Sequence, residues 1–113
     1  MHEMSLAQAL VDQVTELAEK EGCRKVLCVD VSIGALSGVM RESLEFCFPM
    51  VAGGTALDGA VLNVTEVPLT AECGDCGRIS NPEPFEIECC HCGSMNLIVT
   101  KGREFKLISF EVE

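Results

Sequence analysis

The stretch from Cys73 to Gly93 reads CGDCGRISNPEPFEIECCHCG and holds two copies of a Cys-x-x-Cys-Gly motif. Each motif predicts a tight turn whose two thiolates point at one spot, because the glycine allows the positive φ that turns backbone N–H groups towards the sulfurs. Two such turns facing each other form the tetrahedral tetrathiolate of a structural zinc site. A disulfide pair and unrelated free thiols are the alternatives. The predicted zinc ligands are Cys73, Cys76, Cys89 and Cys92.

The composition of the chain indicates its cellular compartment and the kind of partner that it binds. The chain has 113 residues, eight cysteines and a net charge of -10. It contains no stretch of about 18 uncharged apolar residues, so we expect no membrane span. Its N-terminus lacks the basic start and apolar core of a signal peptide, so we expect a cytoplasmic protein, where reduced thiols favour metal over disulfides. The acidity argues against nucleic-acid binding and suits metal cations or a basic protein surface, although acidity also serves solubility alone.

Outside the cysteine motifs the apolar periodicity predicts two helices and three strands. Residues at helical spacing recur from Ser5 to Glu21, and a second helix is expected from Glu42 to Ala52. Alternation predicts strands over Lys25–Leu36, Ala60–Val67 and Phe105–Glu113. The predicted core-facing residues are Leu6, Leu10, Val14, Leu17 and Ala18 in the first helix and Leu27, Val29, Val31 and Ile33 in the first strand.

The order of these elements predicts an α+β fold with an insertion. The last strand needs a sheet, and the only sheet with spare apolar surface is the one built by the first half of the chain. We therefore expect a discontinuous domain, residues 1–68 and 103–113, with two helices and a small sheet of about three strands. Residues 69–102 form an inserted zinc-ribbon-like domain, which is too small to fold well without its ion.

The first residues offer a second kind of metal site. The imidazole of His2, its backbone nitrogen and the α-amino group of Met1 lie close in covalent space. Such nitrogens chelate a metal in a plane, a geometry that selects Ni(II) or Cu(II) over zinc, and Glu3 offers another backbone nitrogen or a carboxylate to orient the imidazole. On residue types alone, a histidine near a terminus is more often solvated than bound to metal.

A family resemblance favours the metal site. The segments MHEMSLA (1–7), VSIGALS (31–37) and SLEFCF (43–48), together with the order of elements and the cysteine motifs, resemble the HypA/HybF family of nickel chaperones in [NiFe]-hydrogenase maturation. The resemblance covers essentially the whole chain. It implies a nickel domain and a zinc domain, with nickel on His2, Glu3 in support, and zinc on Cys73, Cys76, Cys89 and Cys92. It also implies delivery of Ni(II) to a hydrogenase large-subunit precursor, a HypB-type GTPase as partner and, for some relatives, urease maturation proteins.

Two residues beside the zinc motif need separate treatment. The family often has proline after the third zinc cysteine, where this chain has Cys90. Cys90 therefore competes with Cys89, but only Cys89 completes a Cys-x-x-Cys pair with Cys92. His91 lies between ligands and is either a metal- or pH-responsive group or an exposed turn residue; the second interpretation is favoured.

The sequence gives no indication of an enzyme. It has no paired-carboxylate arrangement, no nucleophile elbow and no GxxxxGK[ST] phosphate loop, so any GTP hydrolysis would belong to a partner. The alternative functions are a zinc-ribbon adaptor that binds protein or nucleic acid, and a rubredoxin-like electron carrier, since paired Cys-x-x-Cys-Gly motifs also hold iron. Neither explains the first seven residues.

Overall fold

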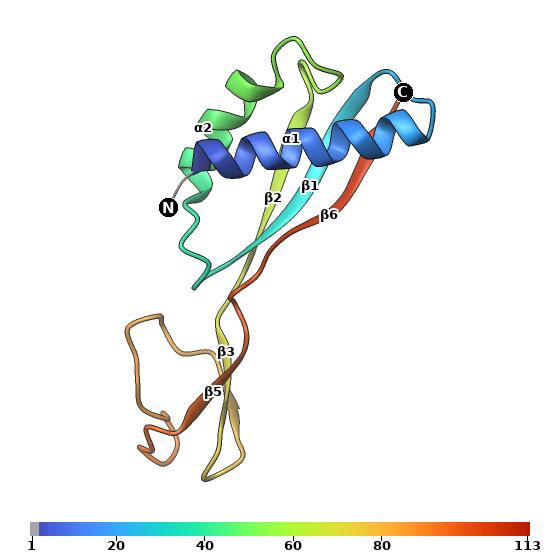
Figure 1. Ribbon diagram of the computed structural model, residues 1–113. Coiled ribbons are helices and arrows are strands. Elements are labelled where there is room, and N and C mark those ends of the chain that lie inside the picture. Colours follow the sequence, from blue (N-terminus) through green and yellow to red (C-terminus); the bar gives the residue numbers. More distant parts are fainter. Residues whose placement is uncertain (1–2) are drawn as a thin grey trace.

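The computed structural model describes residues 3–113 and contains two separate three-stranded sheets. The larger sheet has the order β2-β1-β6, in which β1 runs parallel to β2 and antiparallel to β6. The last strand of the chain therefore returns to the sheet built by the first half (Figure 1). The elements of this unit are α1 (Glu3–Lys20), β1 (Val26–Gly34), α2 (Arg41–Ala52), β2 (Val61–Val67) and β6 (Phe105–Val112).

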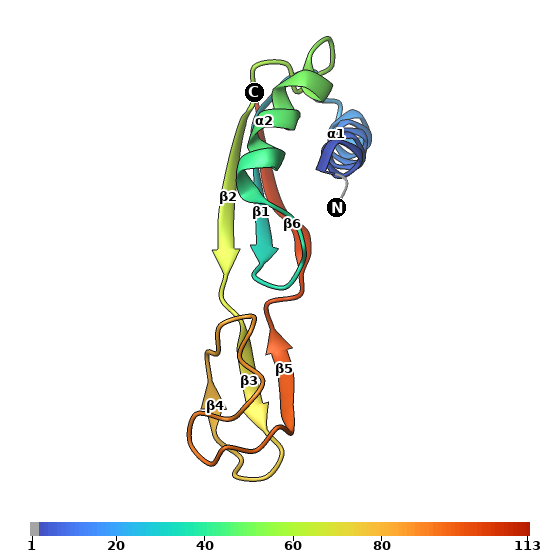
Figure 2. The ribbon, with the colours of Figure 1, turned by 90° about the vertical axis from the view of Figure 1, so that its left-hand side faces the viewer.

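Both helices pack on one face of this sheet and leave the other face bare (Figure 2). The stripe that α1 buries differs from the predicted one, because Leu17 is 36% exposed at its edge while Ala7 and Val11 are fully covered. The largest fully buried side chains are Phe48 and Leu44 of α2 and Leu57, which follows that helix. The residues that form the core are Ala7, Leu10, Val11, Val14, Ala18, Val26, Val29, Val31, Ile33, Leu44, Phe48, Ala52 and Leu57.

A β-bulge in β1 makes its buried face differ from the predicted one. Val29, Val31 and Ile33 are buried as expected, but Leu27 is 43% exposed and Val26 is buried in its place. The register with β6 shifts between Val26 and Cys28. An extra residue in a strand reverses the alternation of side chains beyond it, so period-two counting fails there.

The smaller sheet has the order β4-β3-β5, with all pairs antiparallel. Its strands are β3 (Thr70–Cys73), β4 (Ile79–Ser80) and β5 (Leu97–Lys101). They extend the molecule to 54 Å along its longest axis. The first cysteine motif begins at the last residue of β3 and continues into the connection to β4, and the second motif lies in the connection between β4 and β5. The limits 69 and 102 of the inserted domain stay a prediction.

The two sheets meet where the backbone of Gly34 lies against that of Gly102. The amide of Gly34 donates to the Glu104 carbonyl and that of Leu36 to the Gly102 carbonyl, each at 2.6 Å. Gly102 has φ +113°, and a Cβ there would lie 2.8 Å from Cα of Leu69. Only glycine fits this crossing without strain. Within residues 3–113, no helix is both long and apolar enough to cross a bilayer.

Candidate metal centre

Four sulfur atoms converge at the end of the smaller sheet. The Sγ atoms of Cys73, Cys76, Cys89 and Cys92 all lie within 4.8 Å of one another. Two distances cross between the motifs: 3.6 Å from Cys73 to Cys92 and 3.7 Å from Cys76 to Cys89. A tetrahedral zinc site with Zn–S bonds of about 2.3 Å requires sulfurs about 3.8 Å apart. The donor set and its spacing therefore fit a tetrathiolate metal centre.

The two cysteine motifs are built alike. In the first, the Gly77 amide donates to the Cys73 carbonyl at 2.9 Å; in the second, the Gly93 amide donates to the Cys89 carbonyl at 2.8 Å. Gly77 has φ +75° and Gly93 has φ +77°, which is the left-handed conformation that the sequence predicted for them. The leading cysteine of each motif is buried, and the trailing cysteine is exposed.

Backbone amides prepare the first motif to bind a cation. The amides of Cys76 and Asp75 each donate to Cys73 Sγ at 3.4 Å and lower the pKa of that thiol to about 6. The opposite holds for Cys92: the Ser94 amide lowers its pKa, but the neighbouring thiolates and partial desolvation of the sulfur outweigh that effect and raise it to about 12. Four clustered thiols cannot all ionise without a cation, so the arrangement favours a divalent metal.

A polar bridge that the sequence analysis missed joins the two motifs. The Ser94 hydroxyl donates to the Asp75 carboxylate, and the same hydroxyl accepts from the Asn96 amide at 3.0 Å. The carbonyl of Asn96 accepts in turn from the Gly74 amide at 2.8 Å. The sequence signal was present, since Asp75 lies inside the first motif and Ser94 directly follows the second. Residues that position the ligands of a metal site without touching the metal themselves tune its affinity.

Cys90 and His91, the two residues between the predicted ligands Cys89 and Cys92, lie outside the sulfur cluster. The structure places Cys89 in the cluster and leaves Cys90 exposed. His91 is also exposed, and its Nδ1 lies 3.5 Å from Nη1 of Arg78. The cluster contains four sulfurs and no fifth donor from these two residues.

The predicted nickel ligand His2 lies outside the described residues, but its neighbour Glu3 is placed. Glu3 opens α1, and its Oε2 accepts from the Met40 amide at 3.1 Å, just before α2. Glu3 and Met4 also line an open surface cavity together with residues of α2, including Phe46 and Cys47. The hydrogen bond between Glu3 and Met40 thus links the start of α1 to the segment that joins β1 to α2.

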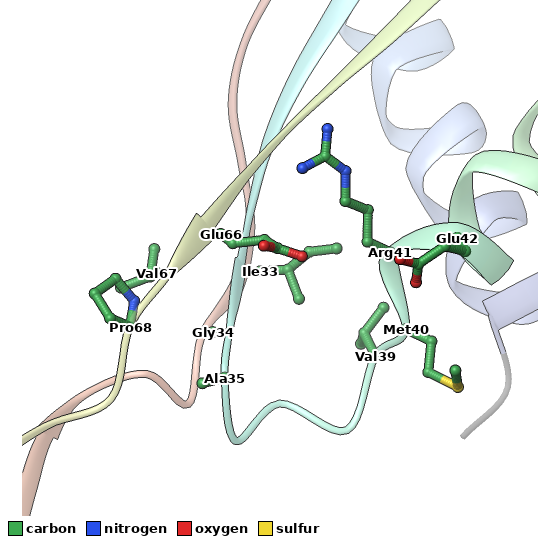
Figure 3. Close-up of a pocket in the computed structure, with 10 residues that line it drawn as sticks. All are labelled: Ile33, Gly34, Ala35, Val39, Met40, Arg41, Glu42, Glu66, Val67 and Pro68. Atoms are coloured by element: carbon green, nitrogen blue, oxygen red, sulfur yellow. The ribbon is translucent and has the colours of Figure 1, made fainter. Parts of the chain in front are cut away.

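A second cavity of about 510 Å³ lies under that segment, between the first turn of α2 and the end of β2 (Figure 3). Its walls include Met40, Val39 and the carboxylates of Glu42 and Glu66. Among residues 3–113, these carboxylates belong to no group of three metal-binding side chains, and the cysteine cluster is the only such group.

The fold and this cluster define a class: a small α+β protein with a tetracysteine metal centre at the end of an added sheet. Comparisons with known proteins identify the family. The model of the family described as hydrogenase/urease nickel incorporation metallochaperone, HypA, matches residues 1–112. The hydrogenase maturation factor HypA of Chlorobium limicola is 43% identical over 114 residues, which covers 100% of this chain and 97% of that one.

Solved structures agree with the sequence comparison. The solution structure of the Ni metallochaperone HypA from Helicobacter pylori matches with TM-score 0.69 and 29% identity, covering 99% of this chain and 97% of that one. A second solution structure of a HypA protein matches with TM-score 0.74 and 29% identity over 100% of this chain and 97% of that one. The chain belongs to the HypA family of nickel metallochaperones and hydrogenase maturation factors. This family match confirms the resemblance drawn from the sequence. The family's role in maturation is consistent with the expectation that the protein is not an enzyme.

Proposed function

We propose that this protein is a cytoplasmic metallochaperone that binds Ni(II) and delivers it to the precursor of a [NiFe]-hydrogenase large subunit, with a HypB-type GTPase as partner. The observation that carries the proposal is the family match along residues 1–112. The eight cysteines are all free thiols, which suits a reducing compartment. A match that names urease as well as hydrogenase supports urease maturation proteins as further partners.

Nickel is the cargo, and we place it at the N-terminus with His2 as a ligand. A metal that is to be handed over needs a site open on one side, where the recipient replaces one donor at a time. Glu3, the adjacent residue, lines a surface cavity and is held by the Met40 amide. The contact fixes the start of α1 and supports Glu3 as a residue that positions the site.

We place Zn(II) at the four cysteines, as a resident structural ion. Four thiolates complete the coordination of zinc and leave no open position, as structural sites require. Cys73 and Cys89 are buried, at 1% and 3% exposure, which suits an ion that stays. The division into a closed zinc site and an open nickel site favours metal transfer over the electron-carrier and adaptor alternatives.

Nickel titration of the zinc-loaded protein tests the proposal. The His2→Ala variant should lose Ni(II) binding, because the imidazole is removed, while it keeps one zinc per chain. The matched control is His91→Ala, since these are the two histidines of the chain, and it should bind nickel as the wild type does. Unchanged nickel stoichiometry and affinity in His2→Ala would refute the N-terminal site. A red, iron-loaded protein with reversible redox chemistry would instead support the electron carrier.

A further inference from the structure

The outward face of the smaller sheet carries one carboxylate between two exposed isoleucines. By register, Glu72 of β3 lies beside Ile79 of β4 on one side and Ile98 of β5 on the other. These side chains point away from the buried Ala71 and Cys73, because successive residues of a strand face opposite sides. Ile79 is 68% exposed and Ile98 is 55% exposed. Glu72 is also exposed.

The bare face of the larger sheet shows how a central carboxylate is otherwise accommodated. Asp30 of β1 lies between Asn63 of β2 and Ser109 of β6. Asn63 donates to one carboxylate oxygen of Asp30 at 2.9 Å, and Ser109 donates to the other at 3.0 Å. Polar neighbours of this kind suit a sheet face that stays in water.

Glu72 occupies the corresponding central position in the smaller sheet, but both of its cross-strand neighbours are isoleucines. An isoleucine cannot donate a hydrogen bond, and within residues 3–113 Glu72 takes part in neither of the ion pairs nor in any side-chain hydrogen bond. The two basic residues nearest in register are directed elsewhere: Arg78 pairs with Cys73 through its carbonyl and its Nη1 lies 3.5 Å from Nδ1 of His91, and Lys101 lies opposite Thr70. Apolar area around an unpaired charge fits a partner that brings a cation and apolar contacts together.

Charge decides between the possible occupants. A second copy of this chain, docked about a two-fold axis, would bring two Glu72 carboxylates together, and each copy has a net charge of -10. The occupant is therefore a different, locally basic protein. Figure 1 shows the smaller sheet at the end of the molecule away from α1 and α2, so a partner docked there leaves the start of α1 accessible.

We propose that the face formed by Ile79, Glu72 and Ile98 docks the polypeptide that receives the metal, through a lysine or arginine flanked by apolar side chains. This identification of the occupant rests on the proposed function. Docking at a distance from the nickel site holds the recipient in place while its ligands replace the donors one by one. The apolar flanks exclude water from the ion pair, which strengthens it.

The test measures the binding of purified hydrogenase large-subunit precursor to the full, zinc-loaded chain by biolayer interferometry. Glu72→Lys should raise Kd about 30-fold, because the charge pair becomes a repulsion, and the double variant Ile79→Ser/Ile98→Ser should raise it about tenfold. The matched control is Glu111→Lys, the same charge change on the bare face of the larger sheet, and it should stay within about twofold. Zinc content identifies any variant that fails to fold, and Glu72→Gln then replaces Glu72→Lys.

Two results would overturn the docking face: wild-type Kd in both face variants, or equal weakening by Glu111→Lys. No binding of the precursor to the wild type would instead overturn the proposed delivery to that precursor. A loss confined to the partner GTPase would overturn the choice of occupant. Nickel titration separates these failures from failure of the proposed function, because the face variants should bind Ni(II) as the wild type does whereas His2→Ala should not.

Discussion

The larger sheet and the smaller sheet are stabilised by different interactions. The larger sheet has two helices on one face and a core of thirteen buried hydrophobic side chains. In the smaller sheet and its connections, the buried hydrophobic residues are only Leu69, Ala71, Cys73 and Cys89, and two of these are metal-site cysteines. A unit this small buries too little apolar surface to offset the entropy of folding. The larger unit is therefore stabilised by its hydrophobic core, and we infer that the smaller unit needs the metal ion proposed for its cysteine cluster.

The largest expected effect comes from removing one sulfur of the cluster. Cys89→Ser should abolish zinc binding, whose free energy in structural sites is about 10–16 kcal/mol, and should unfold β3, β4 and β5 while the larger sheet persists. Zinc content and amide hydrogen exchange measure the two effects. Cys90→Ser is the control and should keep its zinc. Full protection of β3 in a zinc-free variant would contradict the comparison.

The converse change removes a core side chain from the larger unit. Phe48 is 1% exposed, and Phe48→Ala should lower the free energy of unfolding by about 3–5 kcal/mol while zinc stays bound. Phe46 lies in the same helix at 73% exposure, so Phe46→Ala should change stability by no more than about 0.5 kcal/mol. Urea denaturation measures both variants. Equal destabilisation by the two would show that α2 does not pack as described.

A smaller effect is expected at the junction between the sheets. Gly102→Ala forces a Cβ against Leu69 at a backbone conformation that disfavours it, and should cost about 1–3 kcal/mol. Gly53, with φ -57° and ordinary space around it, provides the control; Gly53→Ala should change stability by less than about 1 kcal/mol. Thermal unfolding of both variants measures the difference, and a wild-type Tm in Gly102→Ala would refute the tight crossing.

The smallest effect concerns protons. With a pKa of about 6, Cys73 is already a thiolate at neutral pH, whereas Cys92, with a pKa of about 12, is protonated. Acid should therefore displace the metal as Cys73 becomes protonated, when the pH falls through about 6. Because the pKa of Cys73 lies below its ordinary 9.0, the stability that its thiolate contributes to the folded cysteine unit is complete above about pH 9 and is lost as pH falls through about 6.

Zinc retention against a chelator, measured across this pH range, should fall steeply as the pH drops below about 6. Retention that is independent of pH in that range would contradict the low pKa of Cys73.

Local patterns explain most of what could be predicted. The spacing of four cysteines indicated the cluster, and helical and alternating periodicity indicated α1, α2 and the three strands of the larger sheet. The prediction was wrong at Leu27 and Leu17, where a bulge and the edge of a helix decide burial. It missed the bridge from Ser94 to Asp75, because two polar residues nineteen positions apart show no periodicity that would pair them.

By itself the sequence determined the ligand types, the family and the order of elements, because these depend on residue identity and on spacing along the chain. Only the tertiary structure decided which thiol of Cys89 and Cys90 joins the cluster, how Gly34 and Gly102 connect the sheets, and that Glu72 lies between Ile79 and Ile98. These facts depend on register and on backbone approach between distant segments, which alternation within one segment does not encode.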